Sequence, residues 1–157
     1  MRDKICKVIA TFFYTGYMPI APGTWASLFT VLAFWAFAHW VGLDLGIFAL
    51  TTAIVSLLGI FAAQRMVKLN GVEDPRWIVI DETAGMLVSL TPLLLGVPIK
   101  PITLLAAFIL FRIFDILKPF PVGWADRKVH GGLGIVLDDL FAGVYSAVIL
   151  YFCRGLL

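Results

Sequence analysis

Long apolar segments dominate the chain, and short polar segments separate them. Five of these segments approach the about 20 residues that a helix needs to cross a bilayer, and they cover residues 25–43, 45–63, 78–96, 101–119 and 136–153. The first two contain no Asp, Glu, Lys or Arg, whereas the other three carry acidic residues near one end. The pattern predicts an all-α, polytopic membrane protein with five membrane-embedded helices.

The N-terminal segment has a different pattern. Its apolar residues recur at helical spacing, and lysines fall on another face: Ile5, Val8, Ile9, Phe12 and Phe13 against Lys4 and Lys7. This segment is short and amphipathic, which predicts an interfacial helix over residues 3–17. A cleavable signal peptide is the alternative, but Asp3 interrupts the basic region and no small-residue cleavage pattern follows.

Composition narrows the class of protein further. Hydrophobic residues make up 61% of the chain and charged residues 14%, against about 45–50% and about 25% in a soluble domain. This excludes a disordered chain and an ordinary soluble domain, and a net charge of +2 does not indicate a nucleic-acid partner. The 157 residues leave room for one domain, 1–157, with no separate soluble catalytic module.

Basic residues predict the orientation of the helices. If the N-terminus lies in the cytoplasm, ten of the 12 lysines and arginines fall on the cytoplasmic side. The outer side receives Lys100 and Arg154. This asymmetry favours an odd number of spans, with the C-terminus outside.

With this orientation, five carboxylates from three predicted helices lie at one depth. Asp81 and Glu82 begin the third span, Asp115 lies near the end of the fourth, and Asp138 and Asp139 lie near the start of the fifth. An ionised carboxylate costs about 2.5–3.5 kcal/mol at the centre of a membrane helix, and less near its ends. A shared divalent cation, Mg²⁺ or Mn²⁺, would relieve the repulsion among them. The alternative is a set of solvated helix ends without chemistry.

Complementary groups are predicted at the same level. Arg112, Lys118 and Arg127 can neutralise a phosphate, and His130 lies in the same polar region. Thr24 is a predicted N-cap of the first span, whose helix N-terminus offers a further anion site. The positive-inside rule also places basic residues here without any function, and a histidine in a loop is most often a surface residue.

Four sequence blocks carry a family resemblance. They are Pro22-Gly23-Thr24; Asp81-Glu82-x-x-Gly85-Met86; Phe111-Arg112-Ile113-Phe114-Asp115-x-x-Lys118-Pro119-x-Pro121; and Asp126-Arg127-x-Val129-His130-Gly131-Gly132-x-Gly134 followed by Asp138-Asp139. Across nearly the whole chain, these blocks resemble the phosphatidylglycerophosphatase A family. The resemblance implies a magnesium-dependent enzyme of the bacterial inner membrane, with its site facing the cytoplasm. Its substrate would be a membrane phospholipid, phosphatidylglycerophosphate, whose terminal phosphate is removed to give phosphatidylglycerol.

Roles follow for the polar residues as hypotheses. The metal ligands would be the five acids, Asp81, Glu82, Asp115, Asp138 and Asp139. Asp81, Asp115 and Asp139 are expected to matter most for catalysis, and His130 would protonate the departing glycerol oxygen. Thr24, Arg112, Lys118 and Arg127 would bind the phosphate. Direct attack by water and an aspartyl-phosphate intermediate both remain open.

Two other classes of function use similar residues. A magnesium-dependent lipid phosphotransferase also relies on aspartates, but its longer Asp-rich signature is missing here. A cation or proton carrier needs carboxylates spread across the membrane, whereas these lie at one face. Glycines refine the geometry: Gly85 and Gly143 each follow an acid by four residues, so the third and fifth helices are predicted to pack through them, bringing Asp81 and Asp139 together.

Overall fold

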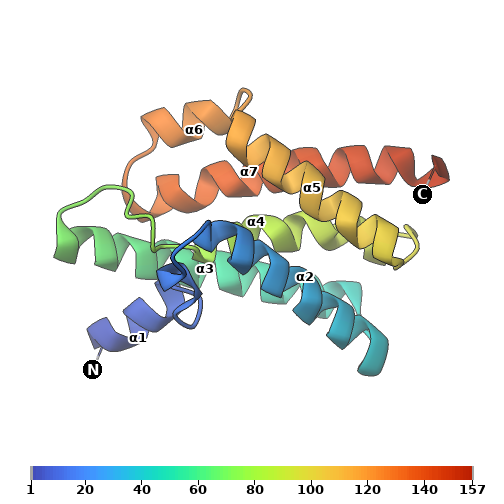
Figure 1. Ribbon diagram of the computed structural model, residues 1–157, viewed down its shortest axis with the longest axis horizontal. Coiled ribbons are helices and arrows are strands. Elements are labelled where there is room, and N and C mark those ends of the chain that lie inside the picture. Colours follow the sequence, from blue (N-terminus) through green and yellow to red (C-terminus); the bar gives the residue numbers. More distant parts are fainter. Residues whose placement is uncertain (1, 157) are drawn as a thin grey trace.

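The computed structural model describes residues 2–156. Within them the chain forms helices and no strand, which confirms the all-α prediction. The α-helices and 3₁₀ segments are, in chain order, α1 (Arg2–Ala10), η1 (Thr15–Tyr17), α2 (Pro22–Trp40), α3 (Leu45–Asn70), α4 (Ile80–Leu90), η2 (Thr91–Leu94), α5 (Pro101–Leu117), α6 (Val122–Lys128), α7 (Gly131–Phe152) and η3 (Cys153–Leu156). Figure 1 shows α1 at one end of the molecule and the C-terminal end of α7 at the other.

Two helical segments of the described chain are long and apolar enough to cross a membrane. They are α3 and residues 131–155, which contain α7. Only 17% of the apolar window of α3 is buried inside the protein, against 44% for the segment that contains α7. Helix α3 therefore presents most of its apolar surface outward. The five-span prediction is not confirmed by these lengths.

The predicted third span, 78–96, is not one continuous helix. Helix α4 has 11 residues, a length of about 16 Å at 1.5 Å per residue, and the hydrocarbon core is about 30 Å thick. The helix ends at Leu90 and η2 follows, with Pro92 inside it. Proline has no backbone N–H, so it interrupts the α-helical hydrogen-bond pattern. The limits of the other four predicted spans also differ. Helix α2 covers Pro22–Trp40, α3 continues to Asn70, α5 ends at Leu117, and α7 covers Gly131–Phe152.

The N-terminal helix is shorter than predicted and is packed against the protein. Helix α1 ends at Ala10, and Phe12, Phe13 and Tyr14 then turn the chain with positive φ angles. Ile9 and Phe12 contact a buried cluster that includes Met66 of α3. The prediction of one interfacial helix over 3–17 is therefore wrong in extent, because nine residues form a marginal helix that packing on α3 stabilises.

Helix α2 begins earlier than the sequence suggests. Its N-cap is Ala21, and Pro22 occupies the first helical position, where the fixed φ of proline suits a helix start. Thr24 lies inside the first turn and makes no capping hydrogen bond. The prediction that Thr24 is the N-cap is wrong.

Helices α4 and α7 pack backbone against backbone near the acids. A Cβ on Gly85 would lie 2.4 Å from the carbonyl oxygen of Asp139, and a Cβ on Gly143 would lie 2.3 Å from the carbonyl oxygen of Gly85. The two backbones touch at these glycines, as predicted. Deeper in the same interface, the Ser89 and Ser146 Oγ atoms are 2.5 Å apart. This contact fixes the relative position of the two helices that carry four of the acids.

Candidate active site

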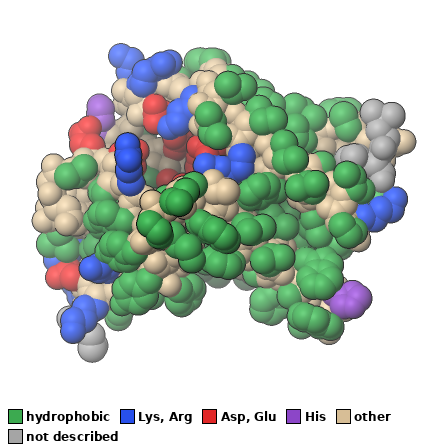
Figure 2. Space-filling view, viewed as in Figure 1, with side chains coloured by type: hydrophobic (Ala, Val, Ile, Leu, Met, Phe, Trp, Pro, Cys, Tyr) green, Lys and Arg blue, Asp and Glu red, His purple; other side chains and the backbone are tan. Residues whose placement is uncertain are grey.

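A polar cavity of about 600 Å³ lies where the start of α4, the end of α5 and the first half of α7 meet. The segment before α2, the loop between α3 and α4 and part of α6 complete its wall. Figure 2 shows a hollow in which acidic side chains gather, with basic side chains beside them. The structure brings all five predicted acids to this cavity: Asp81, Glu82, Asp115, Asp138 and Asp139.

Three of these acids form a compact oxygen cluster. Asp81 and Glu82 lie in the first turn of α4, and Asp139 of α7 faces them. One carboxylate oxygen from each lies within 4.8 Å of the others. A buried oxygen of each, Asp81 Oδ1, Glu82 Oε2 and Asp139 Oδ2, has no hydrogen-bond partner in the described chain. Burying a charged oxygen without a partner is unfavourable, so the cluster fits a divalent cation that prefers hard oxygen ligands.

The start of α2 contributes to the same cluster through a glycine. A Cβ on Gly23 would lie 1.8 Å from Glu82 Oε1, so no larger residue fits here without displacing the carboxylate. The N-terminus of a helix carries a partial positive charge that stabilises an anion. The turn before α2, which the sequence suggested as a phosphate site, is therefore next to a carboxylate of the protein.

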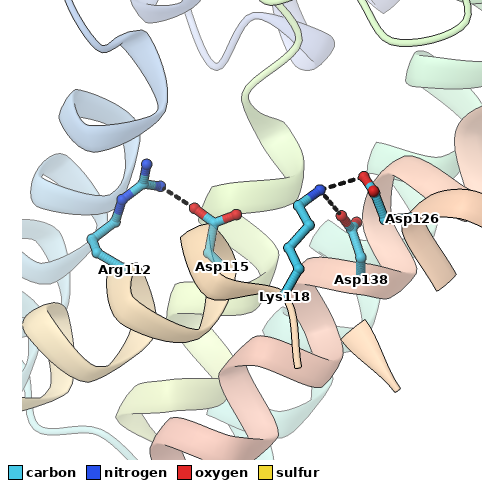
Figure 3. Close-up of polar contacts among 5 residues, drawn as sticks. All are labelled: Arg112, Asp115, Lys118, Asp126 and Asp138. Atoms are coloured by element: carbon cyan, nitrogen blue, oxygen red, sulfur yellow. Dashed lines mark hydrogen bonds and ion pairs between the residues drawn. The ribbon is translucent and has the colours of Figure 1, made fainter. Parts of the chain in front are cut away.

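Beside the cluster, cations and carboxylates alternate, as Figure 3 shows. Arg112 Nη1 lies 2.7 Å from Asp115 Oδ2, one turn along α5. Lys118 Nζ donates to Asp138 Oδ2 at 2.9 Å and also to Asp126 Oδ1. Two predicted metal ligands, Asp115 and Asp138, are therefore paired with the two cations that were predicted to bind phosphate.

Two supporting residues were not identified as functional from the sequence. Asp126 lines the cavity and shares Lys118 with Asp138. Gln64 of α3 accepts a hydrogen bond from the backbone N–H of Gly132 at 2.9 Å, which fixes the start of α7. Asp126 lies within a quoted sequence block, so its signal was available. Gln64 lies far from that block along the chain, and its pairing required the tertiary structure.

The remaining predicted residues lie at the rim or outside the cavity. His130 lines the rim, and its Nδ1 lies 3.6 Å from Glu73 Oε2; both side chains are largely exposed. Asp74 and Arg76, from the loop before α4, line the cavity too. Thr24 and Arg127 are not among the described residues of the cavity wall.

Charge in the cavity is unbalanced. Eight carboxylates line it, against three side chains with a permanent positive charge and one histidine: Glu73, Asp74, Asp81, Glu82, Asp115, Asp126, Asp138 and Asp139 against Arg76, Arg112, Lys118 and His130. Partial burial raises the pKa of the Asp74 carboxyl, and nearby Lys118 opposes that shift. An excess of carboxylates attracts cations and opposes the entry of an anion that no cation accompanies.

The fold and the site define a class: a small all-helical protein with long apolar helices and one acidic, oxygen-rich cavity at their ends. Comparison with known proteins then assigns the family. The chain belongs to the phosphatidylglycerophosphatase A family of phosphoric monoester hydrolases, whose model matches residues 8–154. The resemblance seen in the sequence is confirmed.

Curated relatives cover most of the chain. Phosphatidylglycerophosphatase A of Escherichia coli (strain K12) is 39% identical over 146 residues, 92% of this chain and 81% of the relative. The Haemophilus influenzae protein of the same name is 37% identical over 145 residues, 92% of this chain and 85% of the relative. A Bacteroides thetaiotaomicron protein, named as a candidate phosphatidylinositol-3-phosphatase, is 37% identical over 165 residues, 94% of this chain and 92% of the relative. No solved structure matches the chain.

Proposed function

We propose that this chain hydrolyses the terminal phosphate of phosphatidylglycerophosphate and releases phosphatidylglycerol, with Mg²⁺ as cofactor. Family membership supports the reaction class and the lipid substrate. The observation that carries the proposal is the cluster of Asp81, Glu82 and Asp139, with unpartnered oxygens inside a polar cavity. A phosphate monoester and a divalent cation are the two species that such a site accommodates together.

The three clustered carboxylates would hold the cation, and Mn²⁺ would substitute for Mg²⁺ because both prefer oxygen ligands. When bound, the cation polarises the phosphoryl oxygens and makes water easier to deprotonate. Asp115 and Asp138 line the same cavity and are available as further ligands once Arg112 and Lys118 turn to the substrate.

Cationic side chains would bind the phosphate itself. Arg112 forms its ion pair with Asp115 through Nη1, so its other guanidinium N–H groups can donate to a phosphate. Lys118 has three N–H donors, of which two donate to carboxylates. Hydrolysis forms a phosphorus–oxygen bond from water and breaks the bond to the glycerol oxygen, which needs a proton. His130, an exposed residue that lines the cavity, would supply that proton.

The cavity would lie at the cytoplasmic surface of a bacterial inner membrane. The proposal rests on the ten of 12 lysines and arginines that the sequence assigns to the cytoplasmic side, and on exposed apolar side chains beside the cavity. Ile20 is 76% exposed and Phe120 78%, and Trp124 is exposed nearby on α6. Such residues are stable at a membrane surface. We further propose that the other apolar helices are embedded beside α3 and α7, which completes five embedded helices.

Phosphate release from purified protein in detergent micelles tests the proposal. Phosphatidylglycerophosphate should be hydrolysed in the presence of Mg²⁺, and Asp139→Asn should lose the activity while it keeps the size-exclusion profile of the wild type. A parallel reaction with phosphatidylinositol 3-phosphate is needed because of the name of the Bacteroides relative. Faster turnover of the inositol lipid would replace the proposed substrate, and no release from either lipid would refute the activity.

A further inference from the structure

In the described chain, some of the basic side chains around the cavity form an ion pair with a carboxylate, and one does not. Arg112, Lys118 and His130 each lie within 4.0 Å of a carboxylate oxygen. Arg76 also lines the cavity, from the loop between α3 and α4, and its side chain is exposed. Within the described residues it makes no ion pair and no side-chain hydrogen bond. Among the permanent cations of the described cavity wall, Arg76 is therefore the one that is not already paired with a carboxylate.

The proposed substrate carries two phosphates with different fates. Its terminal monoester is removed, whereas the phosphodiester that joins the two glycerol units remains in the product. The acid cluster lies in the interior of the cavity, where Asp139 is 3% exposed, whereas Arg76 lies on an exposed loop. When the monoester of such a lipid reaches the cluster, its acyl chains stay in the membrane. The diester, which lies between the monoester and the acyl chains, is then near the cavity mouth.

We propose that Arg76 binds this phosphodiester and thereby selects a lipid with two phosphates; the inference rests on the proposed function. A guanidinium forms paired hydrogen bonds with the two free oxygens of a phosphodiester. Glu73 and Asp74 precede Arg76 on the same loop and repel an anion. Within the described loop, residues 71–79, Arg76 is therefore the residue that binds the diester.

Three lipids separate the two phosphates experimentally. Phosphatidylglycerophosphate serves as the substrate. Phosphatidylglycerol, which carries the diester alone, and phosphatidic acid, which carries a monoester alone, are each tested as inhibitors. For Arg76→Ala we expect KM to rise about 10-fold with kcat within about 2-fold of wild type, since one charged hydrogen-bonded contact is lost. The Ki of phosphatidylglycerol should rise by the same factor, and the Ki of phosphatidic acid should stay unchanged.

Controls separate this role from general effects of charge and folding. Lys128→Ala removes an exposed cation of α6 that does not line the cavity, so its three constants should match the wild type. Arg76→Lys keeps the charge but loses the paired geometry and should recover part of the affinity. For Arg76→Ala, an equal rise in both inhibition constants or an unchanged KM would overturn the inference. Absence of inhibition of the wild type by phosphatidylglycerol would overturn it as well. Failure of the wild type to hydrolyse phosphatidylglycerophosphate would instead refute the proposed function.

Discussion

A methyl group at Gly85 tests whether the contact between α4 and α7 positions the acid cluster. In Gly85→Ala the new Cβ would lie 2.4 Å from the carbonyl oxygen of Asp139 and 2.6 Å from Phe111 Cε2. Ordinary contact begins at 3.4 Å, so the helices must separate by roughly 1 Å. The atom that must move belongs to the backbone of Asp139, whose side chain belongs to the cluster.

Stability and activity should respond differently to this change. Overpacking costs about 1–3 kcal/mol, and replacing glycine by alanine within a helix returns about 1 kcal/mol. The net loss of unfolding free energy should therefore be no more than about 2 kcal/mol. A displacement of about 1 Å at reacting groups lowers turnover by about 100-fold. We therefore expect a folded protein with strongly reduced activity.

The assay compares thermal unfolding in detergent with phosphate release from phosphatidylglycerophosphate. Gly59→Ala is the matched control, because a Cβ on Gly59 meets side-chain atoms of Ile80 at 3.3 Å, which can adjust. That variant should keep its turnover, and its melting temperature should not fall below that of the wild type. Gly85→Ala with turnover near that of the wild type would refute the argument that backbone contact sets the carboxylate geometry.

Three further predictions follow from the site. We expect turnover to fall at least about 100-fold in each of Asp81→Asn, Asp115→Asn and Asp139→Asn. Glu82→Gln should have an effect of the same size, because an oxygen of Glu82 belongs to the cluster. A mild effect would show that Glu82 is not a ligand. Chelation should abolish phosphate release, Mg²⁺ or Mn²⁺ should restore it, and full activity after exhaustive chelation would exclude metal dependence. In Lys128→Cys, a membrane-impermeant thiol reagent should label inverted vesicles and not intact spheroplasts; labelling from outside would reverse the orientation.

Helix periodicity explains why much of the site was predictable. An orientation chosen from lysines and arginines placed the acids of three segments at one level, and the structure joins them in one cavity. The spacing of four residues from Asp81 to Gly85 and from Asp139 to Gly143 predicted the contact of α4 with α7. These inferences succeed because residues on one helix face keep their relation in any helical packing.

Other features depend on signals of a different kind. Pro92 interrupts the predicted third span, and Pro22 starts α2 before Thr24; both prolines were visible in the sequence, but apolar character outweighed them. The contact of Gln64 with Gly132 joins residues 68 positions apart, which no local pattern encodes. Tertiary contacts also decide which cations pair with a carboxylate. The structure was therefore needed to show that Arg76 has no such pairing among the described residues.

In the proposed function, the excess of carboxylates links the cofactor to the substrate. Five more carboxylates than permanent cations line the cavity, and two unit charges 4 Å apart interact by about 4 kcal/mol at an effective dielectric constant of 20. A phosphate monoester that entered this field alone would be repelled, so its binding requires cations that the acids have already gathered. Each divalent cation offsets two of the negative charges. In the proposed function, the residues that would hold the metal would therefore also control whether the phosphate binds. The proposed contact with Arg76, an exposed residue of the cavity wall, would attract the lipid before its monoester reaches the acids.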